Sequence, residues 1–187
     1  GAEPDREEPF FLCKPADAVV PHGSFLNFPS AIQNLHHEIE LVVALQKGRK
    51  DIGFEEALDC VFGYAVGIDL TRRDFQGAAK KMGRPWDSGK AFDESALWSA
   101  ICPVTAIGHP QNGTISLDVN GETPQHGDLE QMIWKIPEVI MKLSQLFQLA
   151  PGDLIYTGTP AGVGPLQSGD LVHGRIEAIG ELEITFR

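Results

Sequence analysis

Short apolar runs that end at proline, glycine or asparagine are the feature that most constrains how this chain can fold. Its 187 residues include 20 glycines and 13 prolines, and from Phe10 onward these residues interrupt one apolar segment after another. Such runs favour strands when they contain β-branched and aromatic residues. The segments that fit this description are 38–45, 61–70, 154–157 and 174–186. The sequence therefore predicts a β-rich α+β fold, and its length suits one domain.

Two segments have helical rather than strand character. Residues 72–82 follow Thr71, which we expect to cap a helix there. A second helix is predicted at about residues 136–148, with Pro137 tolerated in its first turn. Its apolar residues share one face, which we expect to pack on a sheet: Val139, Ile140, Leu143, Leu146 and Phe147. The strand at 115–119 runs into Asn120-Gly121, which predicts a hairpin turn.

Charge and composition exclude several classes of partner. The chain carries 26 acidic and 15 basic residues, a formal net charge of −11, and such a surface repels the phosphate backbone of nucleic acids. No apolar run is long enough to span a bilayer. The first ten residues (GAEPDREEPF) are unlike a secretory signal, and the three cysteines form no CxxC pair. These features predict a cytoplasmic globular protein with neither a nucleic-acid nor a membrane partner.

Glu38 and Glu40 are the first candidates for chemistry. Residues two apart on a strand point to the same side, so both carboxylates share one face while Ile39 occupies the other. Neighbouring carboxylates repel each other unless a cation lies between them, and Mg²⁺ or Ca²⁺ prefers such oxygen ligands. The pattern alone also fits a solvent-facing stripe, although the apolar run that begins at Leu41 argues against it.

A second group of polar residues follows the apolar run that ends at Ile68. Asp69 is compatible with a helix cap and with a third oxygen ligand. Arg73, Gln76 and Lys80 would share one face of the following helix, where Arg73 can grip a carboxylate with two hydrogen bonds. A solvated helix surface would show the same pattern. The loop at 157–165 (TGTPAGVGP) lets backbone amides approach a ligand, but it lacks the Gly-Lys-Ser/Thr ending of a phosphate loop.

Taken together, these segments resemble the fumarylacetoacetate hydrolase family, and within it most closely the acylpyruvate hydrolase branch. The similarity covers nearly the whole chain from residue 10 to residue 186, and its specificity comes from the order and spacing of the motifs. The matching segments are 11–15 (FLCKP), 35–41 (LHHEIEL), 63–74 (GYAVGIDLTRRD), 81–86 (KMGRPW), 90–92 (KAF), 119–121 (VNG) and 152–165 (GDLIYTGTPAGVGP).

The resemblance implies a fold, a metal site and a set of substrate contacts. The family has a mixed β-roll-like fold, is usually a homodimer, and holds Mg²⁺, or alternatively Mn²⁺ or Ca²⁺. The positions that match its metal ligands are Glu38, Glu40 and Asp69, and those that match its substrate contacts are Arg73, Gln76, Lys90 and Thr159. In this reading Lys90 is also catalytic, because it adds positive charge near a developing oxyanion.

The activity implied is metal-dependent hydrolysis of a C–C bond in a small 2-oxo or 1,3-diketo acid. The favoured substrate is fumarylpyruvate, which would give fumarate and pyruvate in the catabolism of aromatic compounds such as gentisate. One alternative is an isomerase or decarboxylase of a related 2-oxo acid, such as oxaloacetate or 2-oxo-heptenedioate. Another is a non-catalytic domain that binds a metal or a small acid.

The general base is the part of the family mechanism that the resemblance does not transfer. The family uses a His-x-x-Glu pair on a lid helix that precedes the segment matched here. We therefore expect residues 1–9 to be a flexible remnant, residues 10–187 to be the catalytic domain, and turnover to be low without the lid. His37 and Glu40 have the right spacing but face opposite sides of a strand. His22 and His126 have no evident partner, so no base is assigned.

Overall fold

The computed structural model describes residues 7–21, 25–28 and 34–187, and within them the strands form three sheets. The largest has the order β1-β7-β5-β4-β11, with β8 also paired to β5. Its strands are β1 (Val19–Pro21), β4 (Ile39–Leu45), β5 (Val61–Asp69), β7 (Ala96–Trp98), β8 (Cys102–Pro103) and β11 (Leu154–Tyr156). Because β1 runs parallel to β7 while the other pairs are antiparallel, the sheet is mixed.

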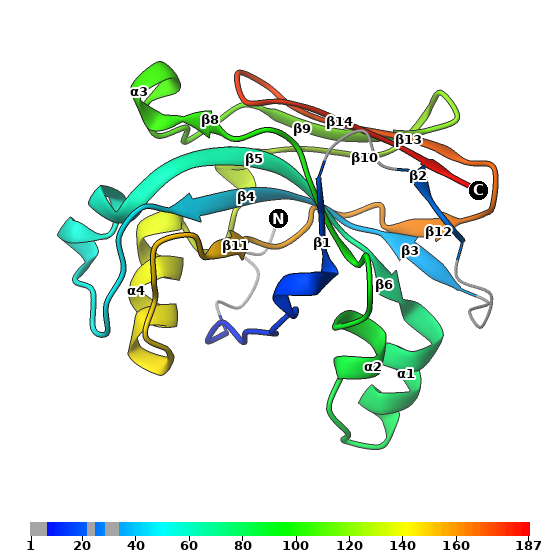
Figure 1. Cartoon of the computed structure of the whole chain (residues 1–187), viewed down its shortest axis with the longest axis horizontal. Coiled ribbons are helices and arrows are strands. Elements are labelled where there is room, and N and C mark those ends of the chain that lie inside the picture. The colour runs from blue at the N-terminus through cyan, green and yellow to red at the C-terminus, as the bar shows by residue number, and fades with distance from the viewer. Residues whose placement is uncertain (1–6, 22–24, 29–33) are drawn as a thin grey trace.

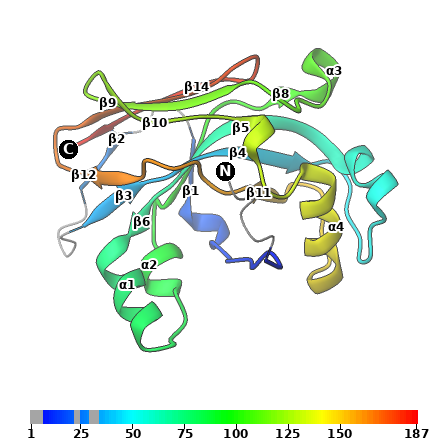
Figure 2. The same cartoon turned by 180° about the vertical axis from the view of Figure 1, so that it is seen from behind.

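A second sheet lies across the first, with the order β10-β9-β13-β14-β2 (Figures 1 and 2). Its strands are β2 (Phe25–Leu26), β9 (Thr114–Val119), β10 (Glu122–Asp128), β13 (Leu171–Ile176) and β14 (Gly180–Phe186). The third sheet contains β3 (Leu35–His37), β6 (Thr71–Arg72) and β12 (Gly164–Leu166), in the order β12-β3-β6. This β-rich, mixed architecture confirms the fold class that the apolar runs predict.

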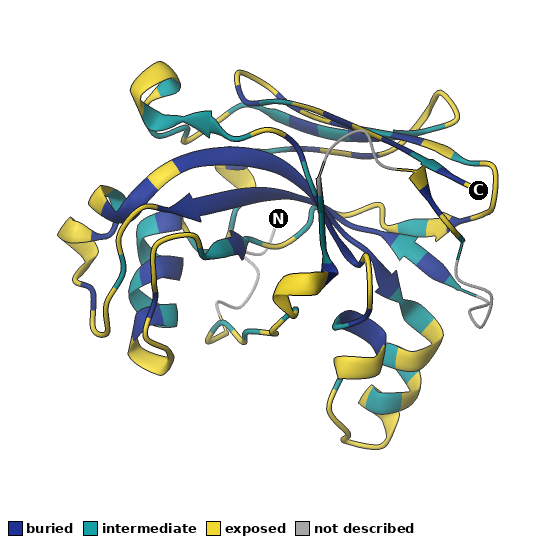
Figure 3. Cartoon of the chain, in the orientation of Figure 1, coloured by how far each residue is buried: buried dark blue, intermediate teal, exposed yellow. Residues whose placement is uncertain are grey.

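The core fills the space between the two large sheets. Strand β4 is buried along its whole length and β5 everywhere except Phe62 (Figure 3). Alternate residues of β4, beginning with Ile39 and Leu41, belong to this core. Close packing against β13 favours a glycine at position 174, because a Cβ there would lie 3.2 Å from the Ile39 side chain and 3.3 Å from the Val66 side chain. Because side chains alternate along a strand, Ile39 points into this core and Glu40 points to the other side of the sheet.

The helices lie around the sheets and not inside them. They are α1 (Arg73–Lys81), α2 (Asp87–Lys90), α3 (Val104–Ile107) and α4 (Ile136–Leu146), with short 3₁₀ helices at Ala16–Ala18, Phe54–Glu56, Leu58–Cys60 and Leu129–Gln131. Helices α1 and α2 lie next to each other beside β6, and α4 lies under the opposite end of β4 (Figure 1). Among the described helices, none has the length and apolar character needed to cross a bilayer.

Both predicted helices form, with corrections at their ends. The first begins at Arg73, and Thr71 does not cap it: Thr71 belongs to β6, and its hydroxyl donates to the Asp69 carbonyl at 3.3 Å. The second carries Pro137 in its first turn as expected. Its C-terminal apolar residues are exposed rather than packed, with 61% of Leu146 and 52% of Phe147 accessible. Helix α4 ends at Leu146, two residues before the predicted end, and Leu143 is the last residue of its apolar face that packs against the core.

Residues 152–165 contain β11 and the loop that leads from it to β12. This loop crosses the edge of β10. Thr157 ties this loop to β4, because its backbone N–H and its hydroxyl both donate to the Leu41 carbonyl, at 3.2 and 2.9 Å. Further along, Gly162 has a φ of +99° and lies directly against the Pro124 carbonyl of β10. The loop is thus held between the two large sheets.

We expect Gly162→Ala to destabilise the protein more than Gly169→Ala. Both glycines have similar positive φ angles, +99° and +94°, so both substitutions strain the backbone. At position 162 the new Cβ would also collide with the Pro124 carbonyl, whereas position 169 is open. The collision should add about 1–3 kcal/mol to the free-energy loss, measured by urea unfolding of both variants. Equal losses would contradict the close approach.

Candidate active site

Glu38 directly precedes β4 and Glu40 is the second residue of that strand, both on the side opposite to the core residue Ile39. Both are buried, with 7% of Glu38 and 4% of Glu40 accessible to solvent. The buried apolar run of β4 carries the two carboxylates inward, which rules out the solvent-facing stripe that the bare pattern also allowed. Strand alternation thus places both carboxylates in the interior.

Asp69 joins them from the neighbouring strand. Strands β4 and β5 are antiparallel partners with Ile39 opposite Ile68, so the end of β5 lies beside the start of β4. The Asp69 N–H donates to the Glu38 carbonyl at 2.9 Å. Each of the three carboxylates offers an oxygen, and these oxygens lie within 4.8 Å of one another. The structure therefore brings together the three predicted ligands; we call Glu38, Glu40 and Asp69 the acidic triad.

Basic side chains neutralise two members of the triad. Lys90, at the end of α2, donates to Glu38 Oε2 at 2.7 Å and to Asp69 Oδ2 at 2.6 Å. Burial lowers the pKa of Lys90, but the charges of Asp69 and Glu38 outweigh it, so the net pKa is raised and the ammonium stays charged. Lys14 Nζ lies 2.8 Å from Asp69 Oδ1. Arg73 Nη2 lies 2.5 Å from Glu38 Oε1.

Glu40 differs from its neighbours because no basic side chain in the described part of the chain forms an ion pair with it. Oε2 of Glu40 accepts a hydrogen bond from the Gly158 N–H at 2.6 Å. Burial and the nearby Asp69 charge raise the pKa of Glu40 to about 8. A divalent cation bound by carboxylate oxygens would supply the positive charge that no basic side chain places beside Glu40. The acidic triad thus fits a hard divalent metal ion.

The predicted substrate contacts surround the triad on different elements. Arg73 Nη1 donates to Gln76 Oε1 at 2.7 Å, so these two residues of α1 act as one unit beside Glu38. Lys80, on the same helix, is exposed and lies outside this group. Thr159 follows Gly158 by one residue, and its hydroxyl accepts from Gln125 Nε2 at 2.9 Å.

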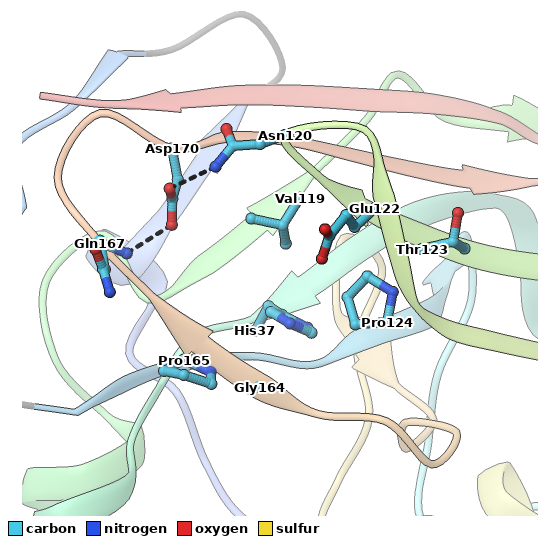
Figure 4. Close-up of a pocket in the computed structure, with 10 residues that line it drawn as sticks. All are labelled: His37, Val119, Asn120, Glu122, Thr123, Pro124, Gly164, Pro165, Gln167 and Asp170. Carbon is cyan, nitrogen blue, oxygen red and sulfur yellow. Dashed lines mark hydrogen bonds between the residues drawn. The ribbon is translucent and has the colours of Figure 1, made fainter.

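None of the three histidines considered as general bases in the sequence analysis forms a hydrogen bond or ion pair with the triad within the described residues. His22 is among the residues that the structure does not describe, and His126 is exposed on β10. His37 is buried, with Nδ1 2.8 Å from Gln125 Oε1. It lines a cavity of about 580 Å³ together with Glu122, Asp170 and other residues, none of them from the acidic triad (Figure 4).

Two polar residues near the site went unassigned in the sequence analysis. Lys14 lies inside a segment that carries the family resemblance, yet only the fold shows that it reaches Asp69 from 55 positions away in the chain. Gln125 is fully buried on β10. Its sequence context of polar residues and a glycine gives no sign of burial. A bulge between Glu122 and Gln125 shifts the register of β10 against β9, so strand alternation does not locate it.

Comparison with known proteins gives a consistent set of relatives. The sequence model described as fumarylacetoacetate (FAA) hydrolase C-terminal matches residues 1–187. A fumarylpyruvate hydrolase from Ralstonia sp is 41% identical over 179 residues, which cover 96% of this chain and 93% of that protein. An oxaloacetate tautomerase from Escherichia coli is 43% identical over 181 residues, covering 96% of this chain and 78% of that protein.

Solved structures agree with these sequence relatives. The crystal structure of fumarylpyruvate hydrolase from Pseudomonas aeruginosa, in complex with Mn²⁺ and pyruvate, superposes with a TM-score of 0.94 at 50% identity. The match covers all of this chain and 82% of that one. A structure titled as a putative fumarylpyruvate hydrolase, from Burkholderia cenocepacia, gives a TM-score of 0.95 at 53% identity, covering 97% and 79% of the two chains. These matches confirm the family resemblance and the fold that it implies.

The raised pKa of Glu40 predicts how the stability of the metal-free protein depends on pH. Between the ordinary pKa of 4.5 and about 8, the native state binds more protons than the unfolded state, so the free energy of unfolding falls as pH rises. Glu40→Gln has no carboxyl group at this position, so its free energy of unfolding should not fall in this way. We expect its advantage over the wild type to grow from pH 5 to pH 8.5, measured by urea unfolding in the presence of a chelator. Glu183→Gln, at an exposed position of β14, is the control; parallel pH curves for wild type and Glu40→Gln would contradict the prediction.

Proposed function

Because the chain belongs to the fumarylacetoacetate hydrolase family, we propose that it is a divalent-metal-dependent enzyme that hydrolyses a C–C bond of an acylpyruvate, by preference fumarylpyruvate. The observation that carries this proposal is the buried acidic triad, whose member Glu40 lacks a basic partner among the described residues while Glu38 and Asp69 are paired with basic groups. The relatives named as fumarylpyruvate hydrolases support the substrate class.

The acidic triad would hold the metal ion, with Glu40 supplying the least neutralised carboxylate. Mg²⁺, Mn²⁺ or Ca²⁺ is compatible with three carboxylates, and the Mn²⁺ in the Pseudomonas aeruginosa structure supports this class of ion. Such an ion, when bound, polarises the oxygens of a 2-oxo acid and stabilises negative charge on them. Glu38 and Asp69 are oriented for this role by the bonds that Lys90 donates to both.

The surrounding groups suit an anionic substrate. Lys90 remains charged in the interior and would stabilise negative charge as it develops in the pyruvoyl half. Arg73 is hydrogen-bonded to Glu38 and Gln76, so its guanidinium lies beside the acidic triad. The Thr159 hydroxyl would form a hydrogen bond with a substrate carboxylate.

Hydrolysis requires water to attack the acyl carbonyl. The water oxygen bonds to the acyl carbon, and the electron pair of the broken C–C bond passes to the pyruvoyl half, which then takes up a proton. We do not assign the general base to His37, because its Nδ1 is already bonded to Gln125 and the cavity that it lines does not include the triad.

A second candidate activity is tautomerisation of oxaloacetate. The Escherichia coli protein named as an oxaloacetate tautomerase is 43% identical to this chain, close to the 41% of the Ralstonia sp fumarylpyruvate hydrolase. The structures named as fumarylpyruvate hydrolases are more similar, at 50% and 53%. Both reactions need the same recognition of a 2-oxo acid, and they differ in whether water attacks a distal carbonyl. A non-catalytic metal- or acid-binding domain is a further reading. The homodimer and the role in aromatic catabolism remain predictions of the family resemblance, and the cytoplasmic location remains a prediction from composition.

A substrate panel distinguishes these functions. The protein, loaded with Mg²⁺ or Mn²⁺, is incubated with fumarylpyruvate, acetylpyruvate or the enol form of oxaloacetate. We expect the diketone absorbance of fumarylpyruvate to fall slowly, with release of one pyruvate per substrate, and Glu40→Gln to abolish this together with Mn²⁺ binding measured by calorimetry. Loss of the oxaloacetate enol, with no cleavage of fumarylpyruvate, would favour the tautomerase. Metal binding without turnover of any substrate would favour the non-catalytic reading.

We expect Arg73→Ala to raise the KM for carboxylate-bearing substrates. Loss of a charge-assisted contact costs about 1.5–3 kcal/mol, or roughly ten-fold to a hundred-fold in KM. Arg73→Lys keeps the charge but not the paired bonds to Glu38 and Gln76, so its KM should lie in between. Lys80→Ala, on the exposed side of the same helix, is the matched control in steady-state kinetics. An unchanged KM in Arg73→Ala would place Arg73 outside the substrate site.

A further inference from the structure

Gln125 uses every hydrogen-bonding position of its side chain although it is fully buried. Its Oε1 is 2.8 Å from His37 Nδ1 and accepts from the Ile39 N–H at 3.1 Å. Its Nε2 donates to Thr159 Oγ1 at 2.9 Å and to the Pro160 carbonyl at 3.0 Å. A buried amide that is satisfied on all sides is held in one orientation.

The partners of Gln125 determine that orientation. The Ile39 N–H can only donate and the Pro160 carbonyl can only accept, so the amide oxygen must face Ile39 and the NH₂ group must face the loop. Thr159 Oγ1 therefore accepts one hydrogen from Gln125, and its own hydrogen is left for another acceptor. The same orientation requires His37 Nδ1 to carry a hydrogen.

Gln125 also connects the two segments that build the site. Ile39 lies between Glu38 and Glu40 in β4, and Thr159 follows Gly158, whose N–H donates to Glu40 at 2.6 Å. The amide reaches both segments from β10, a strand of the other large sheet. It thereby fixes where the Thr159 hydroxyl lies relative to the carboxylates of β4.

We propose that Gln125 is a positioning residue that makes Thr159 a hydrogen-bond donor toward the substrate and so selects a 2-oxo acid with a free carboxylate over an uncharged analogue. The inference rests on the proposed function, because it needs Thr159 to contact a substrate bound beside the metal. A carboxylate only accepts hydrogen bonds, so a hydroxyl whose hydrogen is free is its natural partner. If Thr159 had to donate to residue 125 instead, that contact would be lost.

Gln125→Glu tests whether the direction of the hydrogen bond between residue 125 and Thr159 matters. It keeps the size of the side chain and the oxygen that faces Ile39, and it replaces the NH₂ group by a second oxygen. The Thr159 hydrogen would then be drawn to residue 125. The measurement is calorimetric titration of the Mn²⁺-loaded protein with pyruvate and with pyruvamide, its uncharged analogue. We expect the Kd for pyruvate to rise about ten-fold or more, as for loss of a hydrogen bond to a charged group, and the Kd for pyruvamide to change much less. Gln46→Glu is the matched control, since Gln46 is an exposed glutamine that also donates to backbone carbonyls.

A double-mutant cycle with Thr159→Val shows whether Gln125 acts through Thr159. In the Thr159→Val background, Gln125→Glu should have little further effect on pyruvate affinity, since the hydroxyl that it reorients is gone. Additive effects, or equal weakening of pyruvate and pyruvamide, would show a merely structural role and overturn the proposal. If Thr159→Val alone leaves pyruvate affinity unchanged, the assignment of Thr159 in the proposed function fails instead, and the inference about Gln125 fails with it.

A second measurement covers the case in which Gln125→Glu does not fold. In wild-type protein loaded with diamagnetic Mg²⁺, the side-chain NH₂ signals of Gln125 should shift in NMR spectra when pyruvate is added, because its partner Thr159 gains a new bond. In Thr159→Val the pyruvate-induced shift should disappear. Signals that do not respond to pyruvate in the wild type, while pyruvate binds, would overturn the proposal.

Discussion

Repulsion among three buried carboxylates is the constraint on which the rest of the site depends. Glu38, Glu40 and Asp69 offer oxygens within 4.8 Å of one another in the interior, where charge is poorly solvated. Lys90 and the Arg73 guanidinium offset part of this repulsion, and they come from α2 and α1, the helices that follow β5 and the short β6. The positions of α1 and α2 are therefore part of the electrostatics of β4 and β5. The remaining uncompensated carboxylate, Glu40, is the reason the site fits a divalent cation.

The loop at 152–165 contributes to the site because the two large sheets hold it from both sides. Thr157 is bonded to β4, Gly158 to Glu40, and Thr159 to Gln125 of β10. A loop fixed at consecutive residues can place a hydroxyl and a backbone N–H accurately, as recognition of a small anion requires. The packing of one sheet on the other thus determines the geometry of the proposed substrate contact, although neither sheet alone contains the whole site.

The relatives named as hydrolases and those named as tautomerases fit one physical account of the site. Metal, Lys90, Arg73 and Thr159 would all recognise the part of the substrate that an acylpyruvate and oxaloacetate share, a carboxylate next to a keto group. Discrimination between the two reactions then depends on what surrounds the distal end of the substrate and on the group that activates water. For that reason, similarity of about 40% to members of both classes is compatible with either activity.

The sequence by itself determined the strands, their inward faces and the candidates for metal binding. The two-residue period that buries Ile39 also turns Glu38 and Glu40 to one side, and that geometry is local to the chain. Only the tertiary structure decided which distant groups contact this part of the chain. Lys14, Gln125 and Gly158 come from three separate segments. Antiparallel pairing and the packing of two sheets bring them into contact with Asp69, the Ile39 N–H and Glu40, respectively. Local patterns carry no information about such contacts, because a polar residue reads the same in sequence whether it faces water or completes a buried network across 86 positions of chain.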